Sequence, residues 1–122
     1  MEYKSLGASG LQVSAVGLGC NNFGMRIDKE KSAEVVGRAL ELGINFFDTA
    51  EVYGNGRSEE ILGEALRGRR HEAIIATKVA PPLRPDQVMQ AGRENLRRLD
   101  VESIETCTNF MRRTPAFPYP EP

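Results

Sequence analysis

Apolar and polar positions divide the chain into short apolar runs that alternate with longer amphipathic stretches. Three nearly continuous apolar runs occupy residues 15–19, 44–47 and 73–77. Apolar residues recur at helical spacing in three stretches, at about 28–42, 58–67 and 85–99. Continuous apolar runs are typical of strands covered on both faces. The pattern therefore predicts a strand followed by a helix, three times over, and a parallel sheet.

Residues at the ends of these stretches support the same division. Residues 3–14 read as a hairpin around a glycine-bearing turn. Asp28 can cap the first helix and Gly43 can end it. We predict that Ser58 caps the second helix and that Pro85 begins the third. From the residues alone, a doubly wound sheet and a (β/α)8 barrel both fit this order.

Composition narrows the class of protein. The chain has 122 residues, enough for one modest domain, and its 16 basic residues nearly balance its 17 acidic ones. This balance gives no electrostatic case for a nucleic-acid partner or an anionic membrane. There is no apolar run of spanning length and no visible secretory signal. Cys20 and Cys107 lie far apart and near no other metal ligand, so we expect two reduced thiols, no metal and a cytoplasmic protein.

Three side chains that can take part in proton transfer follow the apolar runs. Asp48 directly ends the second run, Tyr53 lies five residues later among turn residues, and Lys78 ends the third run. Together they form a plausible proton-transfer group. The plainer alternative is a loop tyrosine beside a structural ion pair. The only histidine, His71, precedes the third run, so we expect it on the surface at the opposite end of the strands.

Several motifs in order resemble the aldo-keto reductase family. They are Asp48-Thr49-Ala50 with Tyr53-Gly54, Gly17-Leu18-Gly19-Cys20 before them, Thr77-Lys78 after them, and the opening hairpin. The resemblance covers roughly residues 1–104. It implies a (β/α)8 barrel with the hairpin at its bottom, and reduction of aldehydes or ketones with NADPH, NADH being the alternative. We therefore expect an α/β fold: the N-terminal part of such a barrel, preceded by a β-hairpin and truncated after about three βα units.

The resemblance also assigns roles to residues. Tyr53 would protonate the carbonyl oxygen, Lys78 would stabilise the phenolate, and Asp48 would hold Lys78. A free phenol has a pKa of about 10 and is a poor proton donor near neutral pH. A neighbouring ammonium stabilises the phenolate and so lowers the pKa of the phenol. Gly19, Cys20 and Asn21 would lie near the nicotinamide together with Asp48. The alternative for the segment 19–21 is a simple turn between strand and helix.

The resemblance ends near Ile104. The family pattern Asp-Leu-Tyr-Gln-Leu-His, whose histidine is a fourth catalytic residue, is missing from residues 105–110. A codon choice exists in which removal of one GA dinucleotide at Glu105 restores that pattern. Our hypothesis is an altered reading frame, which would make 105–122 an irregular tail. We predict that the chain packs poorly and lacks regular structure from about Thr106 onward, because four prolines follow Arg112.

Four functions remain open from the sequence. The first is an NADPH-dependent reductase of a small-molecule carbonyl substrate, with this chain inactive by itself. The second is an NADPH-binding, redox-sensing regulatory subunit. The others are a non-functional truncated product and a small structural or interaction domain without chemistry. No nucleic-acid or membrane partner is expected, and the sequence does not define an oligomeric state.

Overall fold

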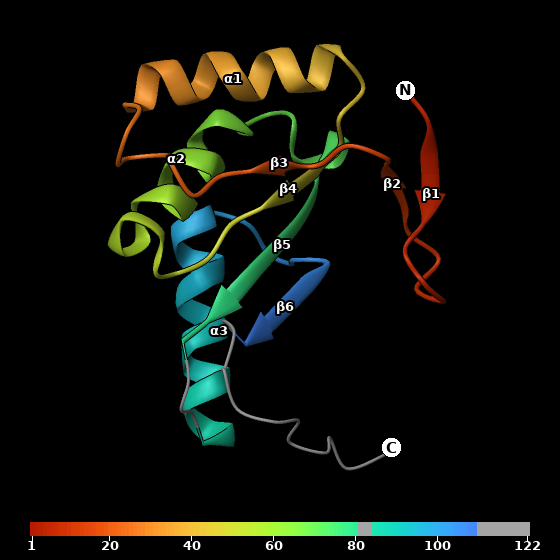
Figure 1. Ribbon diagram of the computed structural model, residues 1–122. Helices are drawn as coiled ribbons and strands as arrows, with labels where there is room; N and C mark the ends of the chain where they lie inside the picture. Colours follow the sequence, from red (N-terminus) through yellow and green to blue (C-terminus); the bar gives the residue numbers. More distant parts are fainter. Residues whose placement is uncertain (81–83, 110–122) are drawn as a thin grey trace.

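A four-stranded parallel sheet forms the centre of the computed structural model, which describes residues 1–80 and 84–109 (Figure 1). Its strands are β3 (Leu18–Gly19), β4 (Phe46–Asp48), β5 (Ile74–Val79) and β6 (Thr106–Asn109). The connecting helices are α1 (Lys29–Glu41), α2 (Arg57–Ala65) and α3 (Pro85–Leu99). Two short 3-10 helices are η1 (Tyr53–Gly56) and η2 (Arg70–Glu72). None of the helices in this described part is long and apolar enough to cross a bilayer.

Strand order decides between the two architectures left open by the sequence. The strands lie side by side in chain order, β3-β4-β5-β6, with no reversal. Right-handed connections between strands in this order place every helix on the same face of the sheet. Figure 1 shows α1, α2 and α3 together on one side. A doubly wound sheet reverses its strand order and carries helices on both faces, so the arrangement favours a barrel wall.

The helices cover the sheet through a continuous apolar core. Phe47 of β4 and Ile75 of β5 are fully buried. They pack in one cluster with Val36 of α1, Leu62 of α2 and Leu99 of α3. Full burial of a side chain of this size contributes roughly 1.5–3 kcal/mol. This layer fixes the positions of the strands and therefore of the side chains at their ends.

The hairpin lies beside the amino ends of the parallel strands (Figure 1). Its antiparallel strands are β1 (Tyr3–Ser5) and β2 (Gln12–Ser14). The hydroxyl of Tyr3 donates to the carbonyl oxygen of Gly43 at 2.8 Å. The side-chain oxygen of Asn45 accepts from the backbone N–H of Ser14 at 2.7 Å. Gly43 and Asn45 lie in the segment just before β4. The predicted hairpin is therefore confirmed, and it is bonded to the amino end of the sheet.

Helix ends agree with the sequence at α1 and α3 and differ at α2. Asp28 caps α1 by accepting from the N–H of Lys31 at 2.8 Å. Pro85 begins α3. The prediction for Ser58 is wrong, because Gly56 precedes α2 and Ser58 lies inside its first turn. The Ser58 hydroxyl instead donates to the carbonyl oxygen of Cys20 at 2.7 Å, a bond across the fold that local sequence does not reveal.

The first parallel strand is shorter and more exposed than predicted. We expected a buried strand over residues 15–19, whereas β3 comprises only Leu18 and Gly19. Leu18 is half-buried and Gly19 is exposed. Within the described residues β3 pairs only with β4, so it is an edge strand of the sheet. Pairing on one side explains why the apolar run does not lead to burial.

The prediction of irregular structure from Thr106 onward is wrong for residues 106–109. These residues form β6, which pairs in parallel with residues 76–79 of β5. The Glu105 carboxylate explains the pairing, since it accepts from the N–H of Ile75 at 2.8 Å and so fixes the start of β6 beside β5. A paired strand here counts against an altered reading frame. Residues 110–122, including the remainder of the predicted tail, lie outside the described residues.

Candidate functional site

Asp48, Tyr53 and Lys78 meet at the carboxyl ends of β4 and β5. The Lys78 ammonium donates to Asp48 Oδ1 at 2.5 Å. The same nitrogen lies 3.5 Å from the Tyr53 hydroxyl oxygen and 5.1 Å from the centre of the Tyr53 ring. The prediction that these three side chains converge at one end of the strands is confirmed. Their chemical roles stay predictions at this point.

The parallel register explains why Asp48 and Lys78 meet. Asp48 pairs with Ala76, two residues before Lys78, so both side chains leave the same face of the sheet. Residues one position away, Phe47 and Thr77, are fully buried. The chain after β4 then fixes the lysine further, because the carbonyl oxygen of Thr49 accepts from the Lys78 ammonium at 3.0 Å. Strand pairing and loop backbone together aim the ammonium at the tyrosine.

The end of β3 places Gly19 beside Asp48, and Asn21 follows in the turn next to Gly19. Gly19 lies opposite Asp48 in the register, and both Gly19 and Asn21 are exposed. A Cβ at Gly19 would meet only Asn21 Oδ1, at 3.7 Å, which is ordinary contact. The Asp48 side chain is itself 43% exposed. This part of the chain therefore offers open backbone at Gly19, the amide of Asn21 beside it, and the Asp48 carboxylate that contacts the lysine.

Cys20 differs from its two neighbours in this turn. It has no exposed surface, and burial raises the pKa of its thiol to about 12. Its backbone N–H donates to the carbonyl oxygen of Asp48 at 2.8 Å, while its own carbonyl oxygen accepts from Ser58. The backbone bonds of Cys20 therefore fix the turn to the loop after β4 and to α2, and its buried side chain is not accessible to a ligand. The predicted contact between Cys20 and a cofactor has no support from its side chain.

Two buried hydroxyls that the sequence did not identify as parts of the site connect the turn after β3 to the loop after β4. Thr49 and Ser58 are both fully buried, and their hydroxyl oxygens lie 2.8 Å apart. Since Ser58 donates to the Cys20 carbonyl oxygen, Thr49 donates to Ser58. Their position in and just after the motif that contains Asp48 was the available signal. The bond from Ser58 to Cys20 could not be predicted, because these two residues are 38 positions apart in the chain.

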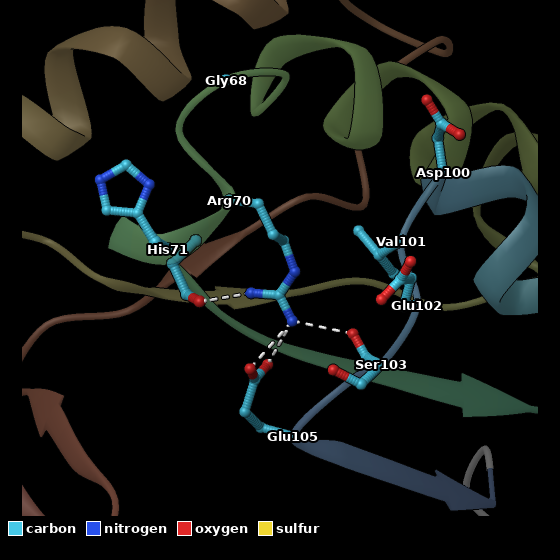
Figure 2. A pocket seen from close by; sticks show the side chains of 9 residues that line it. Gly68, Arg70, His71, Asp100, Val101, Glu102, Ser103 and Glu105 are labelled. Atoms are coloured by element: carbon cyan, nitrogen blue, oxygen red, sulfur yellow. Dashed lines mark hydrogen bonds and ion pairs between the residues drawn. The ribbon is translucent and has the colours of Figure 1, made fainter.

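An open hollow of about 650 Å³ lies at the other end of the strands (Figure 2). The guanidinium of Arg70 crosses its wall and donates to the carbonyl oxygens of Ala73 and Ser103 and to the Glu105 carboxylate. These bonds hold η2 against the segment before β6. His71 lies exposed at this end, as predicted. Because the arginine is engaged by protein groups, we interpret the hollow as structural.

The three convergent groups define what the candidate site can do. A phenol beside an ammonium can give up a proton, because the positive charge stabilises the phenolate that remains. A carboxylate at 2.5 Å holds that ammonium in place. In barrels of this architecture the chemistry takes place at the carboxyl ends of the strands, which is where these residues lie. No cluster of metal-binding side chains occurs among the residues that the structure describes.

Comparison with known proteins agrees with this site and fold. Residues 15–109 match the model of the aldo/keto reductase family, so the chain belongs to that family. An uncharacterized oxidoreductase from Bacillus subtilis is 49% identical over 78 residues, which cover 64% of this chain and 25% of that protein. A probable voltage-gated potassium channel subunit beta from Arabidopsis thaliana is 36% identical over 117 residues, covering 86% of this chain and 36% of that protein.

Solved structures give the same architecture. An aldo-keto reductase from Bacillus halodurans, in its holo form, superposes with a TM-score of 0.77 at 36% identity, covering 85% of this chain and 38% of that one. An aldo-keto reductase from Klebsiella pneumoniae in complex with NADPH has a TM-score of 0.77 at 28% identity, covering 84% and 37%. The sheet described above is therefore part of the wall of a (β/α)8 barrel, as predicted. The chain spans well under half the length of these relatives.

Proposed function

We propose that this chain supplies the proton-transfer part of a carbonyl reductase site that uses NADPH. The observation that carries the proposal is the position of the Lys78 ammonium, which contacts both the Asp48 carboxylate and the Tyr53 hydroxyl. Membership of the aldo/keto reductase family supports oxidoreductase chemistry. The substrate class is an aldehyde or ketone, whose oxygen must receive a proton when its carbon is reduced.

In the proposed reaction each residue has one task. The Tyr53 hydroxyl gives its proton to the carbonyl oxygen of the substrate, and the phenolate that remains is stabilised by Lys78. Asp48 keeps the Lys78 ammonium oriented. Stabilisation of the phenolate by a fixed cation costs no reorganisation at the moment of proton transfer. Thr49 contributes its backbone carbonyl oxygen, which accepts a second hydrogen bond from the Lys78 ammonium and so further restricts its orientation.

The residues present fit a nicotinamide cofactor. Exposed Gly19 lies next to the partly exposed Asp48, and exposed Asn21 lies next to Gly19, so a planar polar ring above Gly19 would meet open backbone, an amide and an acid. Such a cofactor supplies the hydride when bound. The Klebsiella pneumoniae relative is a complex with NADPH, which favours NADPH over NADH here. We assign Gly19, Asn21 and Asp48 to this contact, with Cys20 as its buried anchor.

A chimeric enzyme tests the function directly. Residues 15–109 of this chain replace the matching segment of the Bacillus halodurans reductase, and oxidation of NADPH is followed with an aromatic aldehyde. We expect turnover by the chimera. Tyr53→Phe should lower kcat by about 100-fold or more, because general acid catalysis contributes about 10²–10⁴-fold. The affinity for NADPH should stay within about twofold, since only the proton donor is lost.

Tyr3 offers a matched control once the graft is extended to include the hairpin. Its hydroxyl also bonds within the protein, to Gly43, but at the opposite end of the strands. Tyr3→Phe should leave kcat unchanged. Full turnover by the Tyr53→Phe chimera would remove the assigned role.

We propose that the 122-residue chain alone does not reduce carbonyls. A complete barrel has eight parallel strands, and hydride transfer requires the cofactor to be held in a precise geometry against the carbonyl. The four parallel strands described here present one part of such a wall. The position that the resemblance assigns to the fourth catalytic residue, 110, lies outside the described residues. Steady NADPH oxidation by purified, monomeric chain, lost on Tyr53→Phe, would contradict this.

A second candidate is an NADPH-binding regulatory subunit. It is favoured by the similarity to the probable potassium channel subunit beta from Arabidopsis thaliana. The chimera discriminates, because a regulatory site would bind NADPH and turn over poorly even with Tyr53 intact. Both candidates are compatible with a cytoplasmic location, which we propose because Cys20 and Cys107 are both unpaired.

A further inference from the structure

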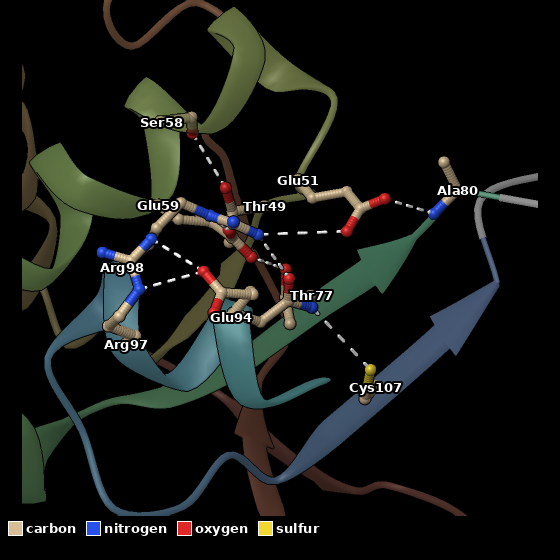
Figure 3. Close-up of polar contacts among 11 residues, drawn as sticks. Thr49, Glu51, Ser58, Glu59, Thr77, Ala80, Glu94, Arg97, Arg98 and Cys107 are labelled. Atoms are coloured by element: carbon tan, nitrogen blue, oxygen red, sulfur yellow. Dashed lines mark hydrogen bonds and ion pairs between the residues drawn. The ribbon is translucent and has the colours of Figure 1, made fainter. Parts of the chain in front are cut away.

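A largely buried arginine near the end of α3, Arg98, contacts the loop that carries Tyr53. Arg98 donates from Nε to the carboxylate of Glu59 at 2.5 Å (Figure 3). A terminal nitrogen of Arg98 donates to the side-chain oxygen of Asn95 at 2.7 Å. Glu59 has no exposed surface, and the Arg98 side chain is 14% exposed. Thr77 of β5 donates to the other oxygen of Glu59 at 2.5 Å. This group of side chains joins α2, α3 and β5 in one fixed unit.

The same arginine approaches the loop on both sides of Tyr53. Two residues before the tyrosine, a Glu51 carboxylate oxygen lies 3.9 Å from Arg98. Three residues after it, Gly56 is buried against the arginine stem: a Cβ at Gly56 would lie 2.9 Å from Arg98 Cδ. Gly56 has a φ of +90, a left-handed conformation that glycine adopts without strain. Only a residue without a side chain fits both the backbone and the arginine at this place.

Glu51 extends the connection to the strand that carries Lys78. Its second carboxylate oxygen accepts from the N–H of Ala80 at 2.8 Å (Figure 3). Its own N–H donates to the carbonyl oxygen of Lys78 at 3.1 Å. Between Glu51 and Gly56 the chain forms the short 3-10 helix η1, which is interrupted at Gly54 and Asn55, both with positive φ. Helical backbone bonds therefore fix this segment only in part, and its contacts with the Arg98 side chain add to them.

We propose that Arg98 is a positioning residue, which fixes the loop 51–56 and so holds the Tyr53 hydroxyl beside Lys78. The guanidinium is suited to this task because it is planar and always charged, so it serves Glu59, Asn95 and Glu51 in fixed directions. The catalytic importance of Tyr53 rests on the proposed function. The position of the loop is independent of that function, and it can be measured in the 122-residue chain without any turnover.

The test compares Arg98→Met with Arg97→Met by NMR and hydrogen exchange. Arg97 is the adjacent residue of α3, and its pair with Glu94 lies on the surface. For Arg98→Met we expect loss of the nuclear Overhauser contact between the Tyr53 ring and the Lys78 side chain. The Tyr53 and Asn55 amides should exchange about tenfold or more faster, while the β5 amides change less. Arg97→Met should change neither measurement.

A second variant removes the effect of an unpaired buried charge. Loss of one partner of a buried pair is strongly destabilising by itself, whereas loss of both is often tolerated. In Glu59→Gln/Arg98→Met no buried charge is left unpaired, and the glutamine oxygen can still accept from Thr77. We expect the folded double variant to show the same faster exchange in the loop. Unchanged loop exchange, an equal rise in loop and β5, or complete unfolding of this variant would each overturn the proposal. Turnover of the chimera, lost on Tyr53→Phe, would then still support the proposed function.

Discussion

The Lys78 ammonium and the Asp48 carboxylate lie 2.5 Å apart, on neighbouring strands and 30 positions apart in the chain. Neither residue could hold this geometry alone, because a lysine side chain has four rotatable bonds and a hydrated charge. The carboxylate and the Thr49 carbonyl oxygen fix the ammonium from two directions, which leaves it directed at Tyr53. The ion pair is therefore part of the candidate site.

Removal of the ammonium should abolish reduction while the fold remains. In the chimeric enzyme we expect Lys78→Met to lower kcat by about 100-fold or more, since the phenolate loses its stabilising charge. Far-UV circular dichroism should be unchanged, because methionine fills a similar volume. Lys29→Met removes an exposed surface pair with Glu64 and serves as the control, with kcat unchanged. Equal kcat values for Lys78→Met and the parent would contradict the role.

The two thiols should differ sharply in reactivity. Cys107 is exposed, whereas Cys20 is fully buried and its thiol pKa is raised to about 12 by burial. The thiolate is the reactive form, so Cys20 has neither access nor ionisation at neutral pH. With an aromatic disulfide reagent we expect Cys107 to react quickly and Cys20 only after addition of urea. Cys107→Ser should remove the fast phase; a fast phase that survives in this variant would show that Cys20 is accessible.

Much of the fold followed from local signals in the sequence. Asp28 capped α1 as predicted, because its carboxylate bonds to a backbone N–H three residues away. The meeting of Asp48 with Lys78 was predictable for a different reason: residues at the carboxyl ends of adjacent parallel strands share one edge of the sheet. In both cases the geometry depends on regular backbone, which the apolar pattern reveals.

The errors arose where a residue's role depends on a distant partner. Ser58 looks like a helix cap, yet its hydroxyl bonds to Cys20, 38 positions earlier in the chain. Residues 106–109 lack the apolar pattern of a strand, yet they pair with β5 after Glu105 anchors the segment to Ile75. Arg98 reads as one more charge at a helix end, and its burial against Glu59 appears only in three dimensions.

Glu59 should make the stability of the chain depend on pH. Burial, only partly offset by bonds from Thr77 and Arg98, raises the pKa of this carboxyl above its ordinary value of 4.5. The folded chain then binds more protons than the unfolded chain between the ordinary and the raised value. Stability falls with rising pH wherever the folded state binds more protons. The contribution of Glu59 is therefore fully present below about pH 4.5 and is lost as the pH rises through the raised pKa.

Urea unfolding at a series of pH values measures this contribution. We expect Glu59→Gln to remove the fall in stability with rising pH that Glu59 causes. The difference in unfolding free energy between parent and variant should therefore change with pH between 4.5 and the raised pKa of Glu59. Glu60→Gln changes an exposed neighbour and should leave the profile of the parent intact. A difference between parent and Glu59→Gln that is constant with pH would show that burial does not perturb this carboxyl.

Two helix glycines should respond in opposite directions to alanine. Gly63 of α2 lies so close to the end of α3 that an added Cβ would be 2.2 Å from the carbonyl oxygen of Leu99. Gly37 of α1 has nothing within 4 Å of the same position. Alanine inside a helix is favoured over glycine by about 0.5–1 kcal/mol, so Gly37→Ala should stabilise the chain by that amount.

For Gly63→Ala the close contact outweighs the helix preference. The obstructing atoms belong to backbone and cannot rotate away, so α3 must shift, and overpacking of this kind costs about 1–3 kcal/mol. We expect a lower urea midpoint than the parent, with an unchanged slope. The shift would also move Arg98, next to Leu99 in α3, so the Tyr53 and Asn55 amides should exchange faster in Gly63→Ala and not in Gly37→Ala. Stabilisation by both substitutions would mean that α2 and α3 do not pack closely at Gly63.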